Sequence, residues 1–253
     1  MHIAVVSLFP VMIREALMHG VLGRAIERGL LEVSCFDPRD HASDVHRTVD
    51  DRPYGGGPGM VLKVEPLRSA LRMAVASAPA GSRRVYLGAD GRRFEQGMAR
   101  AASQGPGLVL VAGRYEGVDE RFLETEIDDV WSIGDYVLTG GELPALVVID
   151  AIGRLLPGVL GCAESAAQES FSDGLVDWPH YTRPLSEAGR TVPDVLASGD
   201  HAAIRRWRLR QALGRTWLRR PELLERRDLT AEERELLEEF KIERAERTGG
   251  NSP

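Results

Sequence analysis

The chain has 253 residues, 43% of them hydrophobic, so it is long enough to form one large or two ordinary globular domains. Its formal net charge of −6 argues against a protein that coats nucleic acid, although a local basic surface can exist within an acidic total. Cys35 and Cys162 belong to no C-x-x-C motif, which argues against a disulfide framework and a structural zinc site, and free thiols fit a cytosolic protein.

The first segment, MHIAVVSLFPVMIREAL, is apolar but short. Pro10, Arg14 and Glu15 interrupt it before it reaches the length of a signal peptide or a membrane span. We therefore expect no export signal, no membrane anchor and a cytoplasmic location.

Short β-branched runs then alternate with stretches of helical periodicity. The runs typical of strands are Ile3–Ser7, Leu31–Phe36, Arg84–Leu87, Leu108–Ala112 and Asp128–Ile133. The stretches typical of helices include Val64–Ala78, Phe94–Ser103 and Leu143–Leu156. This alternation predicts an α/β domain with a parallel sheet that has helices on both faces.

The pattern changes after Pro157 and Gly158, where CAESAAQESFSDG is small, polar and without apolar periodicity. We therefore predict a first domain over residues 1–160, a flexible linker over 161–172 and a second domain over 173–253. The second domain is expected to be small and helical, because its tail from Asp228 to Arg247 is acid-rich and amphipathic.

The segment His201–Arg227 is strongly basic, with nine arginines against two glutamates. Trp207 and Trp217 lie among the arginines, a composition typical of a surface that binds phosphates and stacks on bases. The candidate RNA-binding arginines are Arg205, Arg206, Arg208, Arg215, Arg219 and Arg220. In the alternative interpretation, the arginines pair with the acidic tail and the tryptophans form a small core.

Two glycine-containing segments follow predicted strands, at positions where open α/β folds bind ligands. Gly134, Gly140 and Gly141 lie between the last predicted strand and the helix after it. Gly113 ends the preceding strand. Because glycine lets a ligand approach bare backbone groups, the two loops could enclose one small ligand such as a nucleoside. The alternative is a tight turn that needs glycine only for its geometry.

A further glycine-rich stretch, RPYGGGPGM at Arg52–Met60, lacks the lysine and hydroxyl residue of a P-loop, and Pro58 removes a backbone N–H. No G-x-G-x-x-G follows the first strand either. These absences argue against nucleoside triphosphate and Rossmann dinucleotide sites. We expect either a rigid loop that leaves room for a planar base or a neighbouring subunit, or a plain surface turn.

Six motifs occur in an order and at intervals that resemble those of one known family. They are RPYGGGPGM, AGRYEGVDER, WSIGDYVLTGGELP, PGVLG, HYTRP and IRRWRLRQALGRTWLRRPELL. They span nearly the whole chain and resemble the bacterial tRNA (guanine-N1)-methyltransferases of the SPOUT class. The resemblance implies transfer of a methyl group from S-adenosylmethionine to N1 of guanosine 37, 3′ of the anticodon, in tRNAs whose preceding base is guanosine.

The resemblance also implies a deep trefoil knot at the C-terminal end of the first domain and a homodimer with active sites at the subunit interface. Its partner would be tRNA, with neither DNA nor a membrane implied. The cofactor would be held in a bent shape, largely by backbone groups. The residues that match the family's cofactor pocket are Tyr86, Leu87, Gly113, Tyr115, Glu116, Ser132, Ile133, Gly134, Asp135, Tyr136, Val137, Leu138, Gly140, Gly141 and Pro144.

Catalysis would need a general base, because N1 of guanine carries a proton at neutral pH. The residue that matches the family's aspartate is Glu169, in QES where the usual pattern is EDS, with Asp173 or Asp177 as the alternative. The additional methylene of glutamate matters, since a displacement near 1 Å can cost about 100-fold in rate unless the loop compensates. Arg154 would stabilise negative charge at O6, or would only be a cation near the end of a helix.

His180 and Tyr181, in HYTRP, are expected to face the tRNA, and neither has metal-ligand spacing. The family is associated with Mg²⁺, but no carboxylate cluster here requires an ion, so we assign no metal ligands and leave a role for Mg²⁺ open.

Two rival classes of protein have weaker support. An oxidoreductase would need the missing dinucleotide fingerprint, and a DNA regulator would leave the two glycine-containing strand ends without a function.

Overall fold

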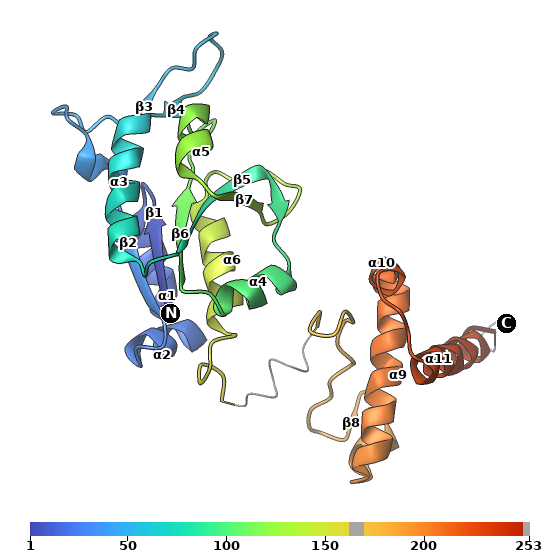
Figure 1. Ribbon diagram of the computed structural model, residues 1–253. Coiled ribbons are helices and arrows are strands. Elements are labelled where there is room, and N and C mark those ends of the chain that lie inside the picture. Colours follow the sequence, from blue (N-terminus) through green and yellow to red (C-terminus); the bar gives the residue numbers. More distant parts are fainter. Residues whose placement is uncertain (162–169, 250–253) are drawn as a thin grey trace. The chain divides into compact units, whose positions relative to one another are not determined.

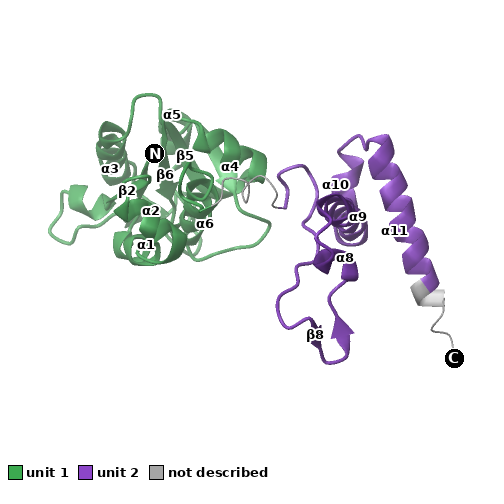
Figure 2. Cartoon of the chain, turned by 90° about the horizontal axis from the view of Figure 1, so that it is seen from below, with its two compact units in different colours: residues 1–163 green, residues 164–253 purple. Residues whose placement is uncertain are grey.

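A computed structural model describes residues 1–161 and 170–249 of the chain. The chain divides into two compact units, Met1–Ala163 and Glu164–Pro253 (Figure 2). The first unit contains the five-stranded sheet, and the second is built mainly from helices. Most of the predicted linker, residues 161–172, lies outside the described residues.

The sheet of the first unit has the strand order β2-β1-β6-β5-β7, and every neighbouring pair is parallel (Figure 1). The strands are β1 (His2–Val6), β2 (Glu32–Phe36), β5 (Arg83–Arg93), β6 (Gly107–Ala112) and β7 (Asp129–Ser132). Each predicted strand is present. β5 is longer than predicted because, after a break in register, Arg92 and Arg93 pair again with β7.

Helices cover both faces of this sheet, which confirms the predicted α/β architecture. Side chains alternate along a strand, so Ile3 and Val5 of β1 face one layer of helices, and Ala4 and Val6 face the other. The first layer consists of α1 (Pro10–Leu17), α2 (Gly20–Glu27), α4 (Gln96–Ser103) and α6 (Glu142–Gly153). The second layer consists of α3 (Val64–Ser77) and α5 (Glu120–Glu126). Between β2 and α3 the chain forms the short helix η1 (Pro38–His41) and the pair β3 (Asp50–Asp51) and β4 (Val61–Leu62).

The second unit packs two long helices, α9 (His201–Arg219) and α11 (Ala231–Gly249), against each other. Its smaller elements are β8 (Ser186–Glu187), β9 (Arg190–Thr191), α8 (Asp194–Ala197) and α10 (Pro221–Glu225). The buried residues between the long helices include Leu213, Leu236 and Leu237. Trp217 remains 37% exposed, so the core of this unit is aliphatic and not the tryptophan core of the alternative interpretation.

The segment that follows β7 reaches the end of β6, which is not the neighbour of β7 in the sheet. β5 lies between β6 and β7 in the sheet, yet the amide of Gly141, just before α6, donates to the carbonyl of Gly113 at the end of β6 (2.8 Å). A Cβ at Gly141 would lie 2.6 Å from Cα of Ala112. Two loops that are distant in sequence therefore meet backbone to backbone at the carboxyl edge of the sheet.

Replacing Gly141 by alanine should destabilise the first unit, because the added Cβ would meet backbone atoms that cannot move aside. We expect the free energy of unfolding in urea to fall by about 1–3 kcal/mol, the usual cost of overpacking. Gly97, in the first turn of α4, is a matched control, since an added Cβ there meets no atom within 4 Å. Gly97→Ala should be neutral or stabilising by up to about 1 kcal/mol. Equal losses of unfolding free energy in both variants would contradict the close approach of Gly141 to Ala112.

A candidate ligand site at the carboxyl edge of the sheet

A cavity of about 270 Å³ lies where β6 and β7 end, beside the break in the pairing of β5 with β7. All of the residues that the sequence matched to a cofactor pocket line it, except Asp135. Its lining also includes residues that the sequence analysis missed, namely Gly88, Ala89, Arg114, Gly117 and Trp131. Gly88, Arg114, Gly117 and Trp131 are each adjacent in sequence to a predicted residue. Gly88 and Ala89 directly follow Leu87, the last residue of a predicted strand, and this position could have identified them. The structure therefore brings three separate loops around one space.

The glycines of this cavity mainly allow neighbouring segments of the chain to approach each other closely. Gly113, Gly140 and Gly141 all lack a positive φ, so another residue could adopt their backbone conformation. A Cβ would instead collide, 2.4 Å from the Tyr86 hydroxyl at Gly113 and 2.3 Å from Nε of Arg114 at Gly140. Gly117 and Gly134 do have a positive φ, of 130° and 149°. Close packing of neighbouring loops, more than turn geometry, therefore accounts for these glycines.

Tyr86 forms one buried wall of the cavity. Burial, with smaller contributions from the charges of Asp90 and Glu120, raises the pKa of its phenol to about 12. The hydroxyl is therefore protonated at neutral pH. It can donate a hydrogen bond to a ligand but cannot supply a negative charge.

Glu116 is the one carboxylate that lines the cavity among the described residues. Its amide donates to the carbonyl of Met60 (3.0 Å), and a Cβ at Gly59 would lie 2.2 Å from its side chain. The glycine-rich loop between β3 and β4 therefore contacts the cavity wall at one end. Its other end is open to solvent, since Tyr54 is 99% exposed.

A buried carboxylate connects the loops around the cavity. Glu142, the first residue of α6, is 1% exposed and accepts hydrogen bonds from Oγ of Ser7 (2.7 Å) and Nε of Arg114 (2.9 Å). Arg114 also donates to the carbonyl of Thr139 (3.1 Å). The helix N-terminus favours a negative charge at this position. The ends of β1 and β6 and the start of α6 are thereby held together by one ionic group.

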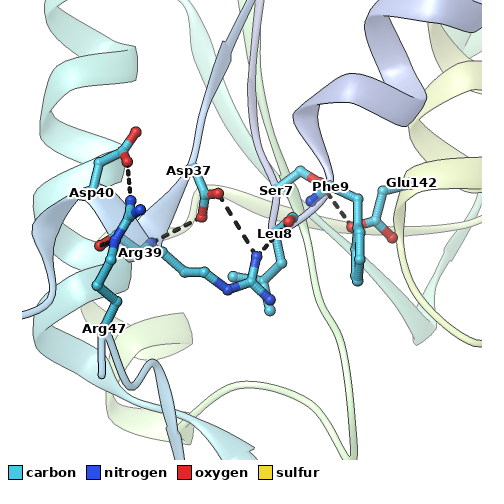
Figure 3. A network of polar contacts seen from close by, with 8 residues as sticks. All are labelled: Ser7, Leu8, Phe9, Asp37, Arg39, Asp40, Arg47 and Glu142. Carbon is cyan, nitrogen blue, oxygen red and sulfur yellow. Dashed lines mark hydrogen bonds and ion pairs between the residues drawn. The ribbon is translucent and has the colours of Figure 1, made fainter. Parts of the chain in front are cut away.

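The segment after β1 is held from its other side as well, as Figure 3 shows for residues around Ser7. The guanidinium of Arg114 lies 4.3 Å from the ring centre of Phe9, and that of Arg39 lies 5.6 Å from it. Arg39 donates to the carbonyl of Leu8 (2.6 Å) and pairs with Asp37 (3.7 Å). Sequence reasoning missed this network, because its members are separated by up to 135 residues and carry no local motif.

Of the two residues predicted to be catalytic, Arg154 is not at this cavity within one chain. Arg154 is the C-cap of α6, and Gly141 at the cavity is its N-cap, so the helix separates them by about 20 Å at 1.5 Å per residue. Glu169 lies outside the described residues. Of its alternatives, Asp177 contacts His180 (2.9 Å), and Asp173 accepts a hydrogen bond from the amide of Leu175 (3.2 Å).

The candidate RNA-binding residues lie in the second unit. Of the arginines on α9, Arg206 pairs with Glu239 of α11 (2.5 Å). Tyr181 packs against Trp207 with ring centres 6.4 Å apart. Arg205, Arg208, Arg215 and Arg219 also lie on α9, with Arg220 directly after it and His180 in the segment before β8. Pairing with the acidic tail therefore accounts for some arginines of α9 and not for others.

Within residues 1–161 and 170–249, no three His, Cys, Asp or Glu side chains are grouped closely enough to hold a metal ion. No helix in the same part of the chain is long and apolar enough to cross a membrane.

Comparison with known proteins connects this site to one family. A family model described as tRNA (Guanine-1)-methyltransferase TrmD matches residues 1–226. A tRNA (guanine-N(1)-)-methyltransferase of Methylococcus capsulatus is 62% identical over 243 residues, which cover 96% of this chain and 97% of the relative. Proteins with the same name from Chromohalobacter salexigens (59% over 251 residues; 97% and 94%) and Salmonella typhimurium (58% over 246 residues; 97% and 96%) are similarly close. The chain therefore belongs to the tRNA (guanine-1)-methyltransferase TrmD family.

Proposed function

We propose that this protein transfers a methyl group from S-adenosylmethionine to N1 of guanosine 37, 3′ of the anticodon, in tRNAs whose preceding base is guanosine. Family membership supports the reaction and the tRNA substrate. The observation that carries the proposal is the cavity at the carboxyl edge of the sheet, where glycine backbones from two loops face one space. Because it acts on tRNA, the protein would work in the cytoplasm.

The cavity fits a small cationic nucleoside. Exposed apolar side chains, Tyr136, Val137 and Leu138, form part of its lining, and a bound ligand would cover them. S-adenosylmethionine, when bound, supplies a methyl group carried on a positively charged sulfur, and Glu116 provides an opposite charge. The residues proposed to hold it are Tyr86, Leu87, Gly113, Tyr115, Glu116, Ser132, Ile133, Gly134, Tyr136, Val137, Leu138, Gly140, Gly141 and Pro144, with Asp135 adjacent to them.

We infer that the chain is knotted, as in SPOUT methyltransferases. The support is the path of the segment after β7, which reaches past the intervening strand β5 and meets Gly113 through the amide of Gly141. A deep trefoil knot is consistent with this crossing. In such a knot, the loops that bind the cofactor would also be the loops that are threaded.

In the proposed mechanism, the carboxylate of Glu169 takes the proton from N1 of guanine, so that the ring nitrogen can form the new N–C bond. The S–CH3 bond of the bound methyl donor would break as this bond forms, and the sulfur would leave as a neutral thioether. Arg154 stabilises the negative charge that develops at O6 as the proton leaves. No step of this mechanism is assigned to Mg²⁺, whose role stays open.

The position of Arg154 supports a role in the site of a second copy. Leu143 and Val147 of α6 are 45% and 47% exposed, and Arg154 follows them at helical spacing on the same face. On the neighbouring helix α1, Val11 is 57% exposed. A two-fold contact along this apolar face would bury it and place the C-terminus of one α6 near the N-terminus of the other. We therefore propose a homodimer whose active sites take Arg154 from the partner.

Replacing Glu169 by glutamine should remove the general base, because a carboxamide cannot accept the N1 proton. With labelled S-adenosylmethionine and tRNA, we expect transfer of label to fall by at least about 100-fold. Cofactor binding, measured by calorimetry, should be unchanged. Glu169→Asp, which restores the family's residue, is the matched control and should remain active. If Glu169→Gln retained full turnover, Asp173 or Asp177 would have to take the role of base.

Heterodimers should show from which subunit Arg154 acts. One subunit carries Arg154→Ala, and the other carries Gly113→Ala, which narrows the cavity against Tyr86. If Arg154 acts on the partner's site, this heterodimer keeps one intact site and about half of the wild-type methylation rate. Both substitutions in one subunit, paired with a wild-type subunit, should then be inactive. The reverse pattern of activities would place Arg154 at the cavity of its own chain.

A further inference from the structure

The arginines of α9 lie on two different faces of the helix. Arg206 and Arg210, one turn apart, form ion pairs with Glu239 (2.5 Å) and Glu243 (3.0 Å) of α11. Arg215 and Arg219, also one turn apart, lie on another face. Within the part of the chain that the structure describes, neither of them has a carboxylate partner. Two positive charges on this face are therefore not neutralised by the described residues.

Arg215 and Arg219 line a pocket of about 400 Å³, together with Arg220 and the segment that precedes β8. The pocket has an excess of positive charge. Its one carboxylate, Asp177, is in contact with His180 (2.9 Å), and Arg220 is paired with Glu222 outside the lining (2.5 Å).

Hydroxyl and aromatic groups complete the same pocket. Oγ of Ser170 accepts a hydrogen bond from the amide of Asp177 (2.9 Å). The hydroxyl proton of Ser170 is therefore available to donate to a ligand in the pocket. Trp178 lines the pocket too and packs against His180, with ring centres 5.6 Å apart. The guanidinium of Arg208 lies 5.0 Å from the Trp178 ring, so this wall is held in place by a cation. The pocket therefore offers a fixed aromatic wall and several donors.

We propose that this pocket binds a phosphodiester group of the tRNA backbone, with Arg215 and Arg219 as its main contacts. Guanidinium groups bind phosphate oxygens through paired, charge-assisted hydrogen bonds, and two arginines one turn apart can contact one phosphate or two neighbouring ones. The inference rests on the proposed function, since tRNA supplies the phosphate. The two faces of α9 would then have different roles: Arg206 and Arg210 hold α11, and Arg215 and Arg219 bind RNA.

The test compares Arg215→Gln/Arg219→Gln with Arg210→Gln, which removes an equally basic residue from the face that contacts α11. The dissociation constant for a tRNA transcript is measured between about 50 and 200 mM salt. The double variant should bind at least about 10-fold more weakly at the lower salt, and the slope of log K against log[salt] should decrease by about 1–2. Arg210→Gln should keep the slope and stay within about twofold of wild type. Equal effects from both variants, or none from the double variant, would overturn the proposal.

Thermal melting of each variant separates loss of binding from loss of folding. A free anion is a second possible source of phosphate, so inorganic phosphate is substituted for chloride at constant ionic strength. An RNA site predicts less than about a twofold change in tRNA affinity, because the total screening is the same. Strong competition by phosphate alone would identify a free-anion site and overturn the assignment.

Methylation by the wild-type protein tests the proposed function separately. If wild type transfers label to tRNA while the double variant binds tRNA normally, the pocket is excluded and the function stands. If wild type transfers no label, the proposed function itself is wrong.

Discussion

The hydrogen-bonded charge of Glu142 is the interaction on which the candidate site depends most. The carboxylate is almost fully buried, and hydrogen bonds from Ser7 and Arg114 compensate for its loss of water. Removing one partner of a buried ion pair costs about 3–5 kcal/mol, because the other charge stays in the interior without compensation. Since Arg114 also holds Thr139, the same ion pair positions the loops after both β6 and β7. The shape of the cavity is therefore set before any ligand binds.

Close packing of backbone segments also determines the shape of the cavity. Gly141 lies so close to the backbone of Ala112 and Gly113 that no side chain would fit between the two segments. Such a wall presents N–H and C=O groups whose positions do not depend on rotamers. A ligand recognised in this way loses little entropy to side-chain ordering in the protein. This suits a cofactor that must be held in one bent shape.

The sequence predicted the strands and the glycine loops because these are local signals, namely apolar runs and residues with distinctive backbone freedom. It could not predict the strand order or the Glu142 network, since both depend on residues that meet only in the fold, such as Ser7 and Glu142. The arginines of α9 show the same limit. Helical spacing alone separates Arg206 and Arg210 from Arg215 and Arg219, but only the packing of α11 shows which pair is neutralised.

Helix α6 connects the proposed cofactor site with the proposed dimer. Its first turn carries Glu142, its exposed face carries Leu143 and Val147, and Arg154 caps its end. In a two-fold contact along this face, one helix would carry both Glu142, which shapes the cavity of its own subunit, and Arg154, which would act in the partner's site. A shift of about one helical turn in the contact would move Arg154 by about 5 Å, well beyond hydrogen-bond reach. The dimer contact would therefore determine catalytic geometry as well as assembly.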